Sequence, residues 1–152
     1  MRLRIDSEIR KLDLLYGNIS AISDDELKAH LSKYFCVKIS GFLENVIKPR
    51  VENISVGTSP KAVSNYLQED VKRVTNLSDD KLLRLLRKFN PDWESKFLEK
   101  VSTQQIESLN SIVSNRNSIA HGQQDNISYR IIGQYFRDIK EIAKILEEIM
   151  KK

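Results

Sequence analysis

The feature that most constrains the fold of this chain is an apolar period of about 3.6 residues that recurs from end to end. The final segment shows it best, because over residues 127–151 the apolar side chains fall on one narrow stripe of a helix. The 152 residues include only 5 Gly and 3 Pro, which argues against a fold of strands and turns. The sequence therefore predicts an all-α fold, a compact bundle of five to seven helices, as a single domain over residues 1–152.

Start and stop signals set the expected bounds of these helices. Ser23, with Glu26 three residues later, has the form of a capping box. Pro49 should end the helix that starts there at about Lys48, because proline lacks the N–H that a helix interior needs. Gly122 is placed to adopt the left-handed conformation that terminates a helix. The expected helices span residues 3–17, 23–48, 60–74, 78–89, 93–98, 102–121 and 127–151.

The second expected helix is apolar around most of its circumference between residues 35 and 47. Its apolar side chains are Phe35, Val37, Ile39, Phe42, Leu43, Val46 and Ile47. Such a helix is buried on several sides, either at the centre of a bundle or partly in an oligomer interface.

Charge and cysteine content narrow the class of protein. The net charge of +4 suits a polyanionic partner, although many proteins that bind no anion share it. Cys36 is the single cysteine, so the chain forms no internal disulfide and no cysteine-based zinc site, and we expect a small core residue there. No signal peptide and no apolar run of membrane-spanning length is present, which predicts a soluble cytoplasmic protein with no membrane partner.

The candidate site lies in the segment of residues 106–122. Helical periodicity places Arg116 in the middle of its apolar face, where a guanidinium is costly unless it meets a partner. Beside that face runs a strip of uncharged polar residues: Asn110, Ser114, Asn117 and His121. Asn117 and His121 are four residues apart, so their side chains can meet. His121 falls in the last turn, where unpaired carbonyls and the helix dipole favour an imidazolium.

An arginine, an amide and a histidine at this spacing suggest chemistry on phosphate. Arginine presents a planar fork that matches phosphate oxygens. Transphosphorylation of RNA needs a group that moves a proton at the 2′-OH or the 5′-oxygen, and a cation that faces the phosphorane. No residues with zinc-like spacing accompany them, and the acidic pairs Asp24-Asp25 and Asp79-Asp80 are explained by helix starts.

Arg116 to His121 forms an R-x4-H motif with a polar residue directly after the arginine, the signature of the HEPN superfamily. The whole chain resembles the RiboL-PSP-type HEPN ribonucleases. The resemblance implies a homodimer whose two chains line one cleft, and RNA cleavage without a metal or other cofactor by Arg116, Asn117 and His121. Glu44 occupies a place where such domains carry a further polar residue, and Ser114 shares the strip with His121, so both are candidate supporting residues. Members often act as toxins or in antiphage defence, which implies an antitoxin or regulatory protein as a further partner.

Two functional hypotheses follow. In the first, the protein is an endoribonuclease that leaves 2′,3′-cyclic phosphate and 5′-OH ends. His121 then acts as general acid or base, Arg116 stabilises the phosphorane, and Asn117 orients His121 or the phosphate. In the second, the chain is a non-catalytic helical adaptor that binds a partner protein or nucleotide. Arg116 then forms a structural ion pair with a carboxylate such as Glu44, and His121 caps its helix.

A basic run is a further candidate for RNA contact. Arg84, Arg87 and Lys88 lie among leucines in the fourth expected helix and would bind phosphates there. Such a run more often indicates a solvated helix face, and the sequence leaves the two interpretations open.

Overall fold

The computed structural model describes the backbone of residues 2–58 and 60–151, and the side chains of residues 4–53 and 60–151. The described residues form seven helices and no strand, which confirms the predicted all-α bundle. The helices are α1 (Arg2–Ser20), α2 (Asp25–Thr58), α3 (Lys61–Lys72), α4 (Asp79–Phe89), α5 (Pro91–Lys100), α6 (Thr103–Ala120) and α7 (Tyr129–Ile149). None of the described helices is long and apolar enough to cross a membrane.

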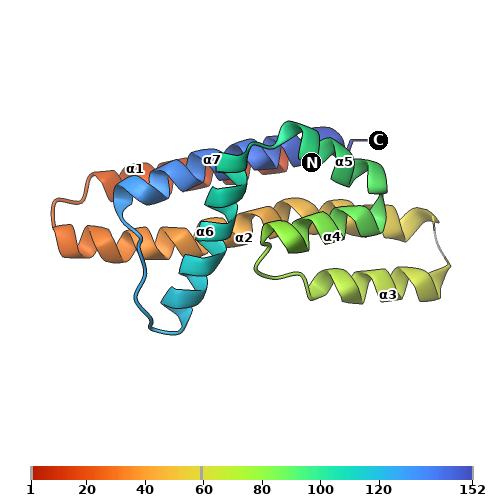
Figure 1. Ribbon diagram of the computed structural model, residues 1–152, viewed down its shortest axis with the longest axis horizontal. Helices are drawn as coiled ribbons and strands as arrows, with labels where there is room; N and C mark the ends of the chain where they lie inside the picture. The colour runs from red at the N-terminus through yellow and green to blue at the C-terminus, as the bar shows by residue number, and fades with distance from the viewer. Residues whose placement is uncertain (1, 59, 152) are drawn as a thin grey trace.

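Helix α2 is the element around which the others are arranged. Helices α1, α3, α6 and α7 each pack against it, and in Figure 1 α1 and α7 run alongside it while α6 crosses it. Its buried side chains are Phe35, Cys36, Ser32, Ile39, Ser40, Phe42, Leu43, Val46, Ile47 and Val51. Val37 is the exception to the predicted burial of residues 35–47, with 38% of its side chain exposed.

The prediction that α2 ends at Lys48 is wrong, because the helix continues through Pro49 to Thr58. A proline inside a helix costs about 3 kcal/mol, since it removes one N–H bond and crowds the preceding turn. Here the carbonyl that loses its partner belongs to Asn45, which is exposed and accessible to water. Beyond the proline, Val51 is buried and α2 packs against α3, and this burial offsets the cost.

The predicted capping box at the start of α2 is displaced by one residue. The cap is Asp24, whose carboxylate accepts a hydrogen bond of 2.8 Å from the N–H of Leu27. Asp24 sits one residue after Ser23, so Glu26 is no longer at the position from which it would complete the box. The predicted start at residue 102 agrees more closely, because Ser102 and Gln105 form a full capping box on α6, whereas α5 begins at Pro91, two residues before its predicted start.

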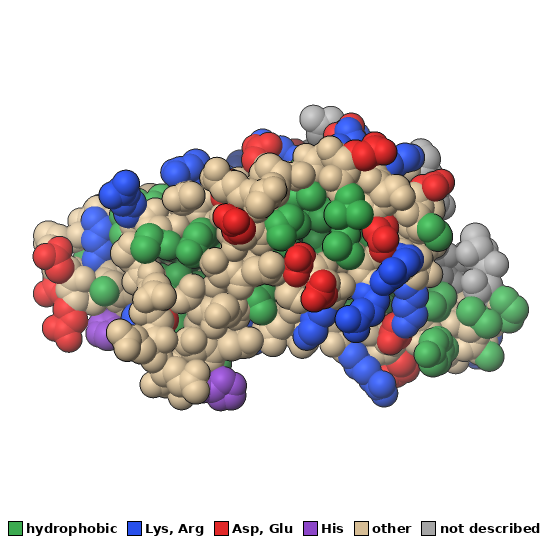
Figure 2. Space-filling model, viewed as in Figure 1, with side chains coloured by type: hydrophobic (Ala, Val, Ile, Leu, Met, Phe, Trp, Pro, Cys, Tyr) green, Lys and Arg blue, Asp and Glu red, His purple; other side chains and the backbone are tan. Residues whose placement is uncertain are grey.

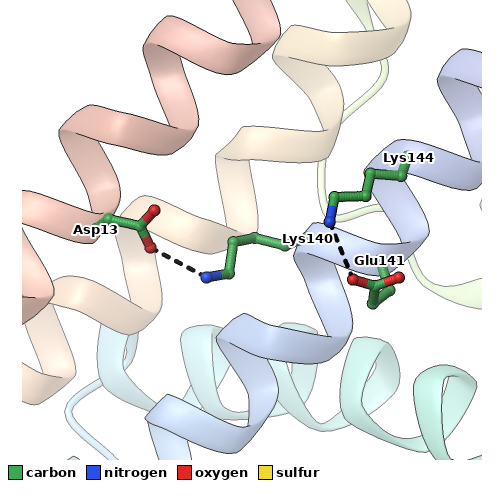
Figure 3. A network of polar contacts seen from close by, with 4 residues as sticks. All are labelled: Asp13, Lys140, Glu141 and Lys144. Atoms are coloured by element: carbon green, nitrogen blue, oxygen red, sulfur yellow. Dashed lines mark hydrogen bonds and ion pairs between the residues drawn. The ribbon is translucent and has the colours of Figure 1, made fainter.

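Helices α1 and α7 are joined by aromatic and charged contacts. The rings of Tyr16 and Tyr129 stack with centroids 4.4 Å apart, and the Tyr16 hydroxyl donates to the Tyr129 carbonyl at 3.1 Å. Burial and this neighbour raise the pKa of Tyr16 to about 12. Farther along, Lys140 of α7 pairs with Asp13 of α1 at 3.0 Å, next to a second pair within α7 (Figure 3).

The Tyr16 contact depends on a glycine in α7. A Cβ built on Gly133 would lie 2.0 Å from the Tyr16 hydroxyl oxygen, so Gly133→Ala must displace the tyrosine. We expect this change to lower the free energy of unfolding by about 1–3 kcal/mol, as overpacked sites do. Urea denaturation followed by circular dichroism measures it.

Gly17→Ala in α1 is the matched control, because nothing lies within 4 Å of its added Cβ. This change should raise stability by roughly 0.5–1 kcal/mol, since alanine loses less backbone entropy in a helix. Equal effects of the two substitutions would contradict the packing described for Gly133.

Candidate functional site

Helix α6 is fully buried near its middle, at Ser108, Leu109 and Ile112, and only partly buried or exposed toward its C-terminal end. It crosses α2 where the thiol of Cys36 donates to the Ile112 carbonyl at 3.8 Å. Cys36 is a fully buried core residue, as predicted, and burial raises the pKa of its thiol to about 12. Beyond this crossing the C-terminal end of α6 projects past the other helices (Figure 1). Arg116, which was predicted to lie in the middle of the apolar face, is therefore only half-buried.

Arg116 is held by an asparagine rather than by a carboxylate. Its Nη1 donates to Oδ1 of Asn76, in the connection between α3 and α4, at 2.5 Å. The backbone N–H of the same Asn76 donates to Oε1 of Glu44 in α2 at 2.8 Å. Arg116 and Glu44 are thus brought together through Asn76, and Arg116 forms no ion pair with any carboxylate that the structure describes.

Asn76 is a site residue that the sequence analysis missed. Its φ of 53° lies in the left-handed region, which asparagine tolerates better than most side chains. This conformation lets its side chain point to α6 while its N–H meets α2, and its carbonyl accepts from the Ser78 N–H at 2.8 Å. An asparagine in a short link just before a helix cap is the signal that would have indicated it.

Of the four residues in the predicted polar strip on α6, one forms a hydrogen bond to another helix and three are exposed to solvent. Oδ1 of Asn110 accepts from the Asp79 N–H at 3.0 Å and so fixes the start of α4. Ser114, Asn117 and His121 are exposed, and their side chains form no hydrogen bond with any described residue. The expected contact between the Asn117 and His121 side chains is therefore absent; their link is the backbone bond of 3.1 Å from the His121 N–H to the Asn117 carbonyl.

The end of α6 is closed by its backbone and not by the imidazole. Gly122 has a φ of 65°, which confirms the predicted left-handed terminator. Its N–H donates to the Ile119 carbonyl at 3.2 Å, and the N–H of Gln123 donates to the Ser118 carbonyl at 2.8 Å. This pair of bonds is a Schellman motif, which satisfies the last carbonyls. The interpretation of His121 as a side-chain cap is not supported, and its ring is available to another molecule.

The chain that follows His121 is fastened to the body of the protein. Oδ1 of Asn115 accepts from the Asn126 N–H at 3.0 Å. Asp125 pairs with Lys33 of α2 at 3.1 Å, and its side chain is only 6% exposed. These contacts fix the path of the chain directly after α6 and with it the position of His121.

The predicted basic run on α4 is divided among three environments. Lys and Arg side chains gather over α3 and α4 in Figure 2. Arg84 and Lys88 line a cavity of about 310 Å³ between these helices, and Lys88 pairs there with Asp70 of α3. Arg87 points elsewhere and pairs with Glu94 of α5 at 3.3 Å. Among the described residues, no group of three or more His, Cys, Asp or Glu side chains is placed to hold a metal ion.

In a comparison with models of protein families, the model of the RiboL-PSP-HEPN family matches residues 2–152. This range includes all seven helices and every candidate site residue described above. No curated protein and no solved structure gives a match.

The left-handed conformation of Asn76 generates a test. Asn76→Gly and Asn76→Ala both remove the bond to Arg116, but only glycine adopts this φ at no steric cost. We expect Asn76→Ala to be less stable than Asn76→Gly by about 1 kcal/mol in urea denaturation. Equal stabilities would show that the backbone at Asn76 is not held in this conformation.

Proposed function

The chain belongs to the RiboL-PSP-HEPN family, and from that premise we propose that it is an endoribonuclease that cleaves RNA without a metal ion or other cofactor. One observation carries the proposal: Arg116 is oriented by Asn76 on one side of α6, while His121, at its end, has no partner within the described chain. A half-buried, oriented cation and an exposed histidine five residues later in the chain suit phosphoryl transfer.

In the proposed reaction the 2′-oxygen of a ribose attacks the adjacent phosphorus, and the bond from phosphorus to the 5′-oxygen breaks. His121 accepts the proton of the 2′-OH as general base or donates one to the departing 5′-oxygen as general acid. The products are a 2′,3′-cyclic phosphate and a 5′-OH. Arg116 faces the charge that develops on the phosphorane oxygens.

The bond to Asn76 orients Arg116 and leaves most of its N–H donors unused. A guanidinium has five N–H donors, and the bond to Asn76 uses one at Nη1. The remaining donors are sufficient for a bidentate contact with phosphate. We assign Glu44 a positioning role through the Asn76 N–H, and Asn117 and Ser114, both exposed, roles in contact with the substrate.

A symmetric dimer would complete this site. Arg116 and His121 are five residues apart on α6, so they point about 140° away from each other around the helix axis. One protomer therefore surrounds the substrate from one side only, and a second copy would supply the same groups across the cleft.

A row of residues along one side of α2 supports a dimer face next to Arg116 and His121. Lys33, Val37 and Glu44 share one side of the helix. Lys33 pairs with Asp125, which follows α6 in the chain, and Glu44 accepts from the N–H of Asn76, which holds Arg116. Residues at both ends of this side of α2 therefore contact segments of the proposed site. Val37, between them, is the one of the seven apolar side chains predicted to be buried in residues 35–47 that is exposed.

The family resemblance also suggests the biological role, a toxin or an antiphage defence protein with an antitoxin or regulatory partner. A non-catalytic adaptor is the competing function, because the bond to Asn76 also suits an arginine that serves structure alone. The experiments below separate the two.

The first experiment is cleavage of a labelled RNA in EDTA by the wild type, Arg116→Ala and His121→Ala. We expect the wild type to leave cyclic-phosphate ends and each variant to be slower by a factor of about 10²–10⁴, as loss of acid–base or charge stabilisation gives. His30→Ala is the matched control, because His30 is the other histidine and is exposed on α2; it should cut as the wild type does. Inert protein in all four cases would favour the adaptor, and equal cutting by all four would remove the motif as the site.

The second experiment is analytical ultracentrifugation. We expect the wild type at twice the 17.6 kDa chain mass, and Val37→Asp at the monomer mass because it buries a charge in the proposed face. Leu14→Asp on α1, where Leu14 is 67% exposed, is the control and should stay dimeric. A monomeric wild type would exclude the shared cleft.

A further inference from the structure

We propose that the cavity between α3 and α4 binds the sugar–phosphate backbone of the RNA strand next to the cleavage site. We call it the basic groove and define it by Arg73, Lys81 and Arg84 at its rim and by Val74, Leu77 and Leu85 at its floor. The inference rests on the proposed function, and it assigns a contact surface away from the R-x4-H motif.

The rim of the basic groove carries positive charge that the protein itself does not neutralise. Arg73, Lys81 and Arg84 are exposed and form no ion pair with any described carboxylate. Lys81 donates only to the Thr75 carbonyl at 3.3 Å. The one acid of the groove, Asp70, is already paired with Lys88. Three cations without counterions around one cavity favour an anionic ligand.

The floor of the groove is apolar and suits the rest of a nucleotide. Leu77 and Leu85 are buried, and Val74 is half-buried. The cavity volume of about 310 Å³ lies at the lower end of the range of small-ligand sites. A nucleotide has a phosphate for the rim and an apolar face for the floor, whereas a carboxylate side chain of an acidic peptide has no such face. Arginine also matches phosphate with two parallel bonds, which favours RNA over an acidic peptide.

The groove shares a wall with the proposed active site. Thr75 and Leu77 line the groove, while Asn76, between them, turns to the other side and holds Arg116. The segment that lines the groove is therefore the one that holds the cation proposed to face the phosphorane. The groove would hold the strand while Arg116 and His121 act on a neighbouring phosphate.

The test uses two pairs of substitutions that each remove one positive charge from adjacent surface. Arg84→Ala alters the groove and Arg87→Ala does not, because Arg87 pairs with Glu94. Arg73→Ala alters the groove and Lys72→Ala does not, because Lys72 pairs with Glu69. The probe is a fluorescent single-stranded RNA with 2′-O-methyl riboses, which lacks the nucleophile and cannot be cleaved, and binding is followed by fluorescence anisotropy.

We expect Arg84→Ala and Arg73→Ala each to weaken binding about tenfold and to lower the slope of log affinity against log salt by roughly 0.7. The two controls should bind within about twofold of the wild type. Circular dichroism melting checks that all four variants are folded, and we expect Arg73→Ala and Arg84→Ala to be folded because neither side chain bonds to a described residue.

Three outcomes would overturn the proposal that the basic groove binds RNA. These are equal losses in the groove and control variants, tighter binding of a poly-glutamate peptide than of the RNA, and no binding of the RNA at all. The result is separable from the ribonuclease assay. If RNA cleavage does not depend on Arg73 or Arg84, the proposed ribonuclease activity stands and the proposed role of the groove does not. If RNA binding depends on these arginines but the wild type does not cleave RNA, the groove binds RNA and the protein is not a ribonuclease.

Discussion

The burial of α2 over about half of its circumference is the constraint on which the rest of this structure depends. Because side chains such as Phe42 and Ile47 point about 140° apart around the helix and are both covered, α1, α3, α6 and α7 must each present an apolar face to the same helix. This burial is also large enough to carry α2 through Pro49, at a cost of about 3 kcal/mol. Extending α2 brings α3 against it, and the connection from α3 to α4 then returns to the level of Glu44. The position of Asn76, and so of Arg116, follows from the packing of α2.

The site differs from the core in how its groups are satisfied. In the core, polar side chains are few, and two of them, Ser32 and Ser40, bond to carbonyls within their own helix. Around the outer half of α6 the partners come from distant segments: Asn76 lies 40 residues from Arg116 and 32 from Glu44. Such bonds cost chain entropy and are retained where they hold a side chain in one orientation. Arg116 is held in this way, whereas Asn117 and His121 are left exposed without a partner in the described chain.

The sequence was sufficient for features that local chemistry decides. The Ser102 cap, the Gly122 terminator and the stripe on α7 each depend on residues within one or two turns, and the structure has all three. It was insufficient where distant packing decides. Helical periodicity gave the direction in which Arg116 points, but the crossing of α6 over α2 determines how much of that face is covered. Likewise, no local pattern shows that Asn76 joins α2 to α6, or that Arg87 turns to Glu94 while its neighbours line the groove.

The bond between Arg116 and Asn76 bears on how a helix end of this kind could act on phosphate. An arginine that extends freely into solvent loses side-chain entropy when it binds an anion, and this loss offsets part of the attraction. Arg116 has already lost much of that freedom on folding, because Asn76 binds its Nη1 and the residue is half-buried. Asn76 is neutral, so it orients the guanidinium without cancelling its charge, which a direct pair with Glu44 would do. Glu44 instead acts one step away, by binding the backbone that carries the amide. The guanidinium of Arg116 is therefore oriented without being neutralised. A cation needs both properties if it is to stabilise charge that appears only in a transition state.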